Sequence, residues 1–336
     1  MGCQLGGRIS RTDEEVRVRS SKPNRYAFFK GEIVPIGEAK IGIMTSAFNY
    51  GTGIFEGLRA YWSAEEEELF IFRLQEHFQR FLRNCRLLLL ELPYTVEQLC
   101  EITVELLRRE SFRADVYIRP LAYKSSEVIG VRLHDLESDC AIFALPFGEY
   151  IDRPGGARVM VSSWRRLSDN AIPPRNKITG AYVNSALAKS EAHLNGFDDA
   201  LMLTEDGHLS EGSAANLFLV RDGRLLTPPV TADILEGITR ATVIELAHDL
   251  GIETLERELD RSELYVAEEA FLCGTAVGVV PLIEVDHRPI GKGAPGPLSS
   301  ELRALYQGVV RGKEPRYRRW CTPVYHAKVL AGADRS

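Results

Sequence analysis

Lys177 lies in a stretch of sequence that could hold a reactive amine in a fixed place. The pair Pro173-Pro174 precedes it and Gly180 follows, which predicts a tight, ordered turn leading into a helix near Ala181. A lysine amine forms a Schiff base with an aldehyde, best where burial or neighbouring groups lower its pKa. Because a single lysine is by default a solvated surface residue, Lys177 needs chemical partners elsewhere in the chain.

Glu211 is the candidate partner for such a lysine. It lies between Ser210 and Gly212, immediately before an apolar run, in a position where glutamate has poor strand propensity. A carboxylate there could keep the nitrogen of a pyridine ring protonated, which makes the ring an electron sink. The alternative interpretation is an ordinary solvated carboxylate in a turn.

A predicted helix start could bind a phosphate group. The segment Gly237-Ile238-Thr239-Arg240 precedes a helical run, where the amides of Ile238 and Thr239 and the threonine hydroxyl would form a cup for an anion. Taken alone, this pattern indicates only a helix N-cap. Arg80, in another predicted helix, could supply a cation, against the default of a solvated helix face. A lysine, a carboxylate and a phosphate cup together are what pyridoxal phosphate requires.

Two further segments could receive carboxylate groups. Gly274-Thr275-Ala276 closes a predicted strand, so backbone amides there could approach a ligand, although small residues are common at strand ends. Tyr117 and Arg119 share one face of a predicted strand because successive side chains alternate, and they could bind a carboxylate or form an exposed strand face. His77 and His193 have no partner pattern, so we assign them no catalytic role.

The hydrophobic pattern predicts an α+β or mixed α/β fold. We expect strands at 26–29, 69–72, 116–124, 141–147, 158–163, 200–204, 216–220 and 270–273, and helices at 78–89, 96–106, 181–194 and 239–250. A proline and two adjacent glycines mark 148–156 as an interdomain linker. The predicted organisation is a mobile tail over 1–24, a small α/β domain over 25–147, and a large cofactor-binding domain over 157–336, with a cleft between the domains.

Composition excludes several classes of partner. A formal net charge of −6 without a basic run argues against nucleic acid. The six scattered cysteines form no C-x-x-C pair and no zinc spacing with histidine, which predicts no metal site and reduced thiols in a cytoplasmic protein. The first residues fit neither a myristoylation signal nor a secretory signal, and the longest apolar stretch, 271–283, is too short to span a bilayer.

Taken in order, these motifs resemble the branched-chain amino acid aminotransferases, in the fold-type IV class of pyridoxal phosphate enzymes. The resemblance covers roughly residues 26 to 325. Its motifs are Phe48-Asn49-Tyr50-Gly51-Thr52, Phe55-Glu56-Gly57-Leu58-Arg59, Glu76-His77 with Arg80, Tyr117-Ile118-Arg119-Pro120, Lys177 with Tyr182, Ser210-Glu211-Gly212, Glu236-Gly237-Ile238-Thr239-Arg240 and Gly274-Thr275-Ala276. It implies a two-domain fold like that of the D-amino acid aminotransferases, with the cofactor in the interdomain cleft.

The resemblance also implies a role for each candidate residue. Lys177 would form the Schiff base and Glu211 would bind the pyridine nitrogen. The other cofactor contacts would come from Arg80, Ile238, Thr239 and Thr275 at the phosphate, Leu235 on the ring and Tyr182 at the ring hydroxyl. The substrate α-carboxylate would meet Tyr117, Thr275 and Ala276, with Arg119 at the distal carboxylate of glutamate. The apolar pocket would be lined by Phe55, Phe147, Tyr150, Tyr182 and a Tyr50 from a partner subunit.

The implied reaction is a ping-pong transamination from leucine, isoleucine or valine to 2-oxoglutarate, giving a 2-oxo acid and L-glutamate. One pocket must then accept both an apolar and an acidic side chain. An arginine at its edge can pair with a carboxylate, yet remain satisfied by tyrosines when the guest is apolar. A homodimer or higher homo-oligomer is implied as well, because Tyr50 would reach across an interface.

The chain departs from the family pattern after Glu211. The family commonly has Gly-x-Gly-Glu-Asn there, whereas this chain has Gly212-Ser213-Ala214-Ala215-Asn216, and Phe147 stands where an indole is often found. Alternatives on the same scaffold are D-amino acid aminotransferases, (R)-selective amine transaminases and aminodeoxychorismate lyases, and a dedicated role on an unusual amino acid stays open. Tyr117 with Arg119 favours the branched-chain enzymes. An alternative of another class is a non-catalytic phosphate-binding module that uses the helix start at 237–240.

Overall fold

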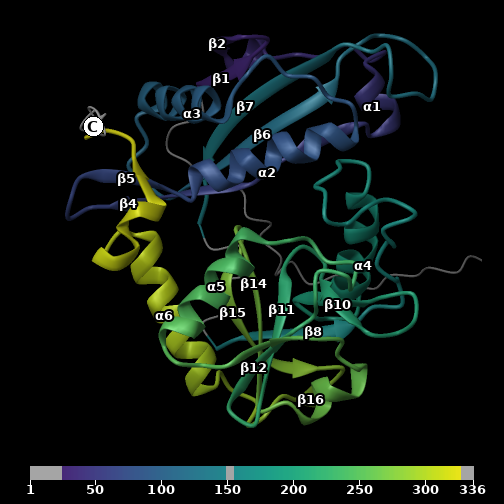
Figure 1. Cartoon of the computed structure of the whole chain (residues 1–336), viewed down its shortest axis with the longest axis vertical. Helices are drawn as coiled ribbons and strands as arrows, with labels where there is room; N and C mark the ends of the chain where they lie inside the picture. The colour runs from purple at the N-terminus through teal and green to yellow at the C-terminus, as the bar shows by residue number, and fades with distance from the viewer. Residues whose placement is uncertain (1–24, 149–154, 327–336) are drawn as a thin grey trace, which may run out of the picture.

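The computed structural model describes residues 25–148 and 155–326, and it contains two β-sheets with helices packed against them (Figure 1). The first sheet has eight strands in the order β17-β5-β4-β6-β7-β1-β2, with β3 paired to β6. All its pairings are antiparallel. Its strands are β1 (Tyr26–Phe29), β2 (Glu32–Pro35), β3 (Gly53–Phe55), β4 (Leu58–Ser63), β5 (Glu68–Phe72), β6 (Val116–Lys124), β7 (Ser138–Pro146) and β17 (Cys321–Pro323).

The second sheet is mixed and has nine strands in the order β10-β9-β8-β15-β14-β11-β12-β13, with β16 paired to β15. Its strands are β8 (Ala157–Val161), β9 (Asp199–Leu203), β10 (Leu209–Gly212), β11 (Asn216–Arg221), β12 (Arg224–Thr227), β13 (Thr254–Glu256), β14 (Glu269–Gly274), β15 (Gly278–Val285) and β16 (Arg288–Pro289). β8 runs parallel to β9 and β15, and β12 runs parallel to β13. The β8–β9 pair needs a long crossover, which contains α4.

The helices cover these sheets in two groups. They are α1 (Ser46–Tyr50), α2 (Leu74–Leu87), α3 (Val96–Glu110), α4 (Tyr182–Leu194), α5 (Ile238–Asp249) and α6 (Pro297–Val310), with the short 3-10 helices η1 (Ile36–Glu38), η2 (Arg261–Val266) and η3 (Pro315–Trp320). α2 and α3 pack together beside the first sheet, while α5 and α6 pack together against β14 and β15 of the second (Figure 1). Among the described residues, we find no helix with the length and apolar character needed to cross a membrane.

Local sequence explains where the helices of the first group form. α3 begins with a capping box, in which Gln98 N donates to Thr95 Oγ1 at 3.3 Å and Thr95 N donates to Gln98 Oε1 at 2.9 Å. On α2 the aromatic rings of Phe78 and Phe81 are fully buried, as their helical spacing predicts. The same helix also buries Arg80, which is unusual for a charged side chain and directs attention to its partners.

The mixed fold inferred from the sequence is confirmed, and every strand and helix expected from the hydrophobic pattern has a counterpart within a few residues. The pattern missed the strands β2, β3, β4, β10, β12, β13, β15, β16 and β17 and the helices α1 and α6. β15 contains Pro281, and α6 follows a segment rich in glycine and proline, so neither gave a clean periodic signal. The predicted tail over 1–24 and most of the predicted linker lie outside the described residues.

The C-terminal part of the chain returns to the first sheet. α6 packs on the second sheet, whereas β17 pairs with β5 of the first, as the yellow segment in Figure 1 shows. The buried carboxylate of Glu68 accepts the backbone amides of Val324 and Tyr325 at 3.0 and 2.8 Å. The sequence-based boundaries placed this strand with the second domain, because a short strand gives no signal of which sheet it joins.

Candidate active site

One cavity of about 830 Å³ gathers most of the residues singled out in the sequence. Its walls include strands of both sheets and the start of α5. The candidate residues that line it are Phe55, Arg80, Tyr117, Arg119, Phe147, Lys177, Tyr182, Glu211, Leu235, Ile238, Thr239, Thr275 and Ala276. Tyr50 does not line this cavity, and Tyr150 lies outside the described residues.

The backbone around Lys177 is fixed against β3. Phe55 N donates to Lys177 O at 3.0 Å, and Thr179 N donates to Gly53 O at 2.9 Å. Lys177 Nζ donates to Tyr182 Oη at 2.8 Å, at the first turn of α4. The amine therefore projects into the cavity with one defined partner, and a solvated surface lysine does not describe it.

Glu211 is buried within β10 and is not a solvated turn residue. Arg166 Nη2 lies 2.7 Å from Glu211 Oε1, while Asn216 Nδ2 and the amide of Leu235 donate to Oε2 at 3.0 and 3.1 Å. Burial raises the pKa of Glu211, and the positive charge of Arg166 acts in the opposite direction. The carboxylate is therefore held rigidly in a low-dielectric wall of the cavity.

Arg80 is oriented by a carboxylate that the sequence analysis gave no role. Its Nε and Nη2 donate to the two oxygens of Glu56 at 2.7 and 2.8 Å, and its Nη1 donates to Glu236 O at 2.8 Å. A guanidinium has more N–H donors than these bonds use, so Arg80 can still donate to a ligand anion. The bidentate pair fixes the plane of the guanidinium.

Glu56 and His77 form the buried end of this cluster. Glu56 Oε2 lies 2.9 Å from His77 Nδ1. Burial acts to raise the pKa of Glu56, but Arg80 and His77 outweigh it and hold this pKa well below its ordinary value. Burial and the nearby Arg80 charge lower the pKa of His77, although Glu56 opposes them. His77 thus supports Arg80 through Glu56, a structural role that its sequence spacing did not indicate.

The start of α5 presents backbone donors to the cavity. The first amides of a helix have no partner within the helix, and Ile238 and Thr239 supply them here. A Cβ at Gly237 would lie 2.0 Å from Asn216 Oδ1, so only glycine permits this packing. Asn216 in turn donates to Leu235 O at 2.9 Å as well as to Glu211, which joins the helix start to the carboxylate wall.

Tyr117 and Arg119 share a face of β6, as the strand alternation predicts. Arg119 Nη2 donates to Tyr117 Oη at 2.9 Å, and its Cζ lies 4.5 Å from the centroid of the Phe55 ring. Arg119 Nε is buried and has no hydrogen-bond partner among the described residues. A Cβ at Gly57 would lie 2.3 Å from Tyr117 Oη, so glycine is what lets the tyrosine lie here.

Arg59 connects two walls of the cavity, although the sequence analysis named it only as part of a motif and gave it no role. Its Nη2 donates to Phe147 O at 2.9 Å, and its Nη1 donates to Gly148 O at 3.1 Å and to Ala276 O at 3.3 Å. These bonds hold Phe147 against the turn that contains Ala276. Three side chains to which the sequence analysis assigned no role share one property, namely that their partners lie far away in the sequence: Arg59, Glu56 and Arg166.

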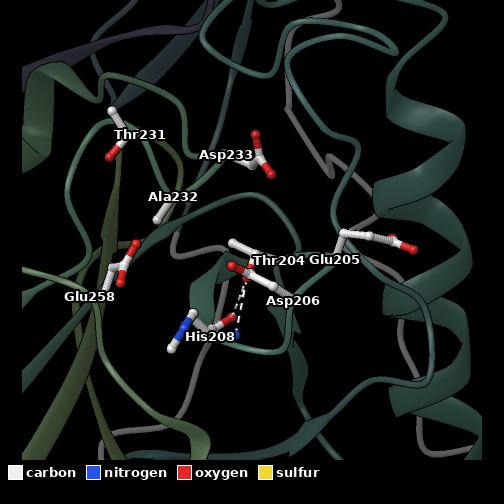
Figure 2. A pocket seen from close by; sticks show the side chains of 8 residues that line it. All are labelled: Thr204, Glu205, Asp206, His208, Thr231, Ala232, Asp233 and Glu258. Carbon is white, nitrogen blue, oxygen red and sulfur yellow. Dashed lines mark hydrogen bonds between the residues drawn. The ribbon is translucent and has the colours of Figure 1, made fainter.

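A second, smaller hollow of about 400 Å³ lies apart from these residues (Figure 2). It is lined by Thr204, Glu205, Asp206, His208, Thr231, Ala232, Asp233 and Glu258, and no lysine lines it. It therefore offers no amine for a Schiff base. Within the described ranges, no group of three histidine, cysteine or acidic side chains could hold a metal ion. We place the chemistry in the larger cavity.

Known proteins match the chain over most of its length. The family model for amino-transferase class IV matches residues 53–285. A probable branched-chain-amino-acid aminotransferase of Aquifex aeolicus is 51% identical over 301 residues, covering 89% of this chain and 97% of the relative. The branched-chain-amino-acid aminotransferase of Escherichia coli K12 is 36% identical over 298 residues, covering 88% of this chain and 96% of the relative.

Solved structures agree with these relatives. The branched-chain aminotransferase of Thermoproteus uzoniensis with norvaline superposes with a TM-score of 0.86 at 44% identity, covering 89% of this chain and 99% of that one. The enzyme of Thermobaculum terrenum in its PLP form also gives 0.86, at 40% identity, covering 90% and 98%. The chain therefore belongs to the class IV aminotransferases, and within them to the branched-chain amino acid aminotransferases.

Proposed function

We propose that this protein is a pyridoxal phosphate-dependent transaminase that moves the amino group of leucine, isoleucine or valine to 2-oxoglutarate. The observation that carries the proposal is the content of one cavity, which holds the Lys177 amine, the buried Glu211 carboxylate and the Tyr117–Arg119 pair. An amine, a ring-nitrogen partner and a carboxylate receptor are what transamination needs.

The donor set of the cavity fits this cofactor. Lys177 would join it covalently, Tyr182 would lie at the ring hydroxyl, Leu235 would pack on the ring and Glu211 would face the ring nitrogen. Arg80, the amides of Ile238 and Thr239, and Thr275 supply donors for a phosphate at the other end. When bound, the cofactor supplies an electron sink for the bond broken at the substrate α-carbon.

Lys177 is also the residue placed to move a proton. Its Nζ is a hydrogen-bond partner of Tyr182 Oη, so its direction stays defined after it is released from the cofactor. The neutral amine would take the proton from the α-carbon of the amino acid and deliver it to the former aldehyde carbon of the cofactor. Glu211 is held by Arg166, so its carboxylate would stay charged where it faces the ring nitrogen.

The remaining wall suits two kinds of side chain. Phe55 and Phe147 give an apolar surface for leucine, isoleucine and valine, whereas Arg119 can pair with the distal carboxylate of glutamate or 2-oxoglutarate. The position of Arg119 in the cavity wall supports this, because a guanidinium has more N–H donors than its bond to Tyr117 uses. When the guest is apolar, Tyr117 still accepts from Nη2.

A second copy of the chain would complete the pocket. The loop before α1, α1 itself and the loop after β6 expose large apolar side chains, namely Ile41, Ile43, Met44, Phe48, Ile129 and Val131. Asn49 Nδ2 donates to Ile43 O and Gly130 N donates to Tyr50 Oη, so the three segments form one surface. Such a surface suits a two-fold interface. We propose a homodimer in which the partner's Tyr50 enters the cavity.

Two coarser features complete the proposal. We propose that the two sheets mark two domains divided near residues 148–156, with the C-terminal strand returned to the first. We also propose a cytoplasmic location, which the unpaired thiols of the described cysteines Cys85, Cys100, Cys140, Cys273 and Cys321 support.

The test uses the purified protein reconstituted with pyridoxal phosphate. Borohydride should fix the cofactor onto Lys177, which peptide mass spectrometry would locate. L-leucine, L-isoleucine and L-valine should each convert the visible absorbance of the bound cofactor to that of the amine form, and 2-oxoglutarate should restore it. Conversion by D-alanine but not by L-leucine would instead assign the protein to the D-amino acid branch, and a colourless, unlabelled protein would sink the proposal.

A further inference from the structure

The phosphate donors of the cavity lie on two helices that belong to different parts of the fold. Arg80 is on α2, which contacts β3 of the first sheet, whereas Ile238 and Thr239 begin α5, which packs against β14 of the second. For these donors to converge on one anion, the two helices must be held at a fixed separation. The contacts that join α2 to α5 therefore bear on cofactor binding.

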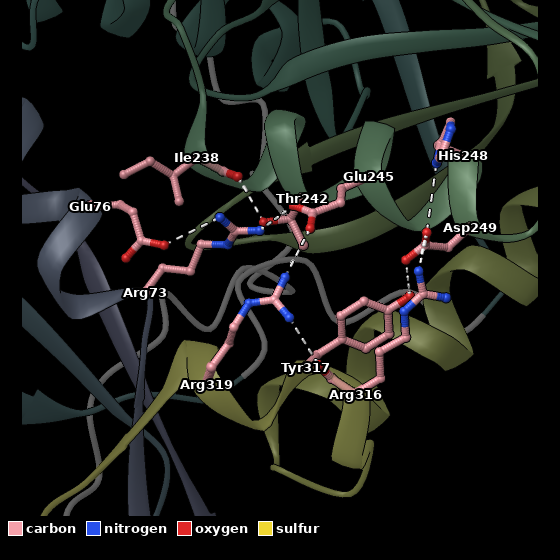
Figure 3. A network of polar contacts seen from close by, with 10 residues as sticks. All are labelled: Arg73, Glu76, Ile238, Thr242, Glu245, His248, Asp249, Arg316, Tyr317 and Arg319. Atoms are coloured by element: carbon pink, nitrogen blue, oxygen red, sulfur yellow. Dashed lines mark hydrogen bonds and ion pairs between the residues drawn. The ribbon is translucent and has the colours of Figure 1, made fainter. Parts of the chain in front are cut away.

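One such contact lies at the N-terminal end of α2. Arg73, the N-cap residue, extends its guanidinium to Glu245 in the last half of α5, with Nη2 3.0 Å from Oε2 (Figure 3). Its Nη1 lies 3.3 Å from Glu76 Oε1. Arg319 approaches the other oxygen of Glu245, at 3.3 Å, so this carboxylate lies between two guanidinium groups.

Arg73 is held more firmly than a surface arginine. Its side chain is only 11% exposed, and its Cζ lies 3.7 Å from the centroid of the Trp320 ring, which is itself buried. Its amide donates to Trp320 O at 2.7 Å, and its φ of 48° is in the left-handed region. Because backbone and side chain are both fixed, the direction of the guanidinium toward Glu245 is preset.

A second contact joins the middle of α2 to the residue just before α5. Arg80 Nη1 donates to Glu236 O, immediately before α5 begins. Arg73 and Arg80 lie about two helical turns apart, as do Ile238 and Glu245. The start of α2 thus meets the later part of α5, and the middle of α2 meets the residue just before α5, where Arg83 Nη2 also lies 3.5 Å from Glu236 Oε2.

The far end of α5 is anchored as well. Asp249 accepts from Tyr317 Oη at 2.6 Å and pairs with Arg316, and both of these residues belong to η3 (Figure 3). α5 therefore does not swing freely about its C-terminal end. The Arg73–Glu245 pair sets how α2 lies relative to a helix that is otherwise fixed.

We propose that Arg73 and Glu245 are positioning residues for phosphate binding, because their ion pair fixes α2 against α5 so that Arg80 and the amides of Ile238 and Thr239 converge on one anion. This rests on the proposed function, which places the cofactor phosphate there. Neither residue lines the cavity. Their effect on the ligand is transmitted through the two helices.

The test uses two ligands to separate the affinity for the phosphate group from the affinity for the rest of the cofactor. Full-length protein stripped of cofactor is titrated with pyridoxal phosphate and with pyridoxal, which lacks the phosphate but retains the aldehyde and ring nitrogen. Arg73→Met and Glu245→Gln should each raise the dissociation constant for pyridoxal phosphate about 5- to 30-fold, as removal of a charge-assisted hydrogen bond predicts. Their dissociation constants for pyridoxal should stay within about twofold of the wild-type value.

A double variant and a matched control complete the design. Arg73→Met with Glu245→Gln should bind pyridoxal phosphate no worse than either single variant, because both remove the same pair. Arg318→Met is the control, because it removes an ion pair that does not join α2 to α5, namely Arg318–Glu66. It should leave the affinities for pyridoxal phosphate and for pyridoxal unchanged.

Unchanged phosphate affinity in both single variants, or equal losses for the two ligands, would overturn the positioning role. Additive losses in the double variant would also contradict it. The proposed function itself fails in a different way, namely if the wild-type protein binds neither ligand covalently.

Discussion

Arg119 is the side chain that we propose distinguishes the two substrates of the reaction. Its Nη2 is occupied by Tyr117 Oη, while its Nε has no partner among the described residues. Arg119→Met should raise the KM for 2-oxoglutarate about 10- to 100-fold, because the distal carboxylate loses a charged partner. The KM for L-leucine should change less than about threefold. Steady-state kinetics with each substrate in turn measures the difference.

Arg119→Lys serves as the control for that variant. It keeps the positive charge but not the fork of a guanidinium, so its KM for 2-oxoglutarate should fall between those of wild type and Arg119→Met. Equal weakening of leucine and 2-oxoglutarate in Arg119→Met would show that the residue acts on the shared α-carboxylate and not on the distal one.

Glu211 gives the second prediction for a single residue. Its carboxylate would balance a protonated ring nitrogen, and glutamine cannot carry that charge. Glu211→Gln should therefore slow the half-reaction with L-leucine about 100-fold or more, while borohydride still labels Lys177. Stopped-flow absorbance of the bound cofactor measures the rate. A rate within about tenfold of wild type would remove Glu211 from the chemistry.

Sequence reasoning found the side chains that line the cavity better than the side chains that hold those in place. Lys177, Glu211 and the segment at 237–240 stand beside glycine, proline or a helix start, which are local signals. Glu56, Arg59 and Arg166 have no local signal, because their partners come from other elements. A buried ion pair between distant segments becomes visible only when the fold places its two ends together.

Secondary-structure elements also differ in whether the local sequence or a distant contact determines them. Hydrophobic runs located the central strands such as β6 and β14 and the amphipathic helices α2 and α3, because burial fixes their periodicity. β17 is held in the first sheet by its pairing with β5 and by Glu68, which are contacts made across the fold. Short strands of this kind carry too few residues for a periodic signal.

η2 offers a pH prediction, because an ion-pair network ties it to its neighbours. Glu263 accepts from Arg257 at 2.8 and 2.7 Å and from Arg221 at 2.7 Å. Arg257 first, and Arg221 with it, lower the pKa of Glu263 from 4.5 to about 2. A carboxyl with a lower pKa in the folded state stabilises the fold above its unfolded pKa, and this contribution is lost as pH falls through the folded value.

Glu263→Gln should therefore lower Tm at neutral pH, and the gap to wild type should narrow as pH falls below about 4.5. Thermal melts of both proteins across the acid range, down to the lowest pH at which each remains folded, measure the gap. A gap that stays constant or widens on acidification would show that the Glu263 charge is not the source of the stabilisation. The effect should be modest, since Arg257 and Arg221 are partly exposed.

On the scale of the whole molecule, we propose that the cavity of one chain is an incomplete site. Tyr50 lies on the exposed apolar surface beside Phe48, which is 67% exposed, and not in its own cavity. If two copies pair through this surface, each supplies the aromatic wall that the other lacks. Substrate recognition would then depend on assembly, because a separated chain would keep its Lys177 and Glu211 but would lack a closed pocket.

Phe48→Asp tests this coupling, because it places a charge in the proposed interface without touching the cavity of its own chain. We expect the variant to elute as a monomer in size-exclusion chromatography with light scattering, to retain covalently bound cofactor, and to show a KM for L-leucine raised at least about tenfold. Val266→Asp, a control at another exposed apolar side chain, should leave assembly and KM unchanged. A Phe48→Asp protein that is monomeric yet fully active would mean that one chain binds its substrates alone, and that Tyr50 has no part in recognition.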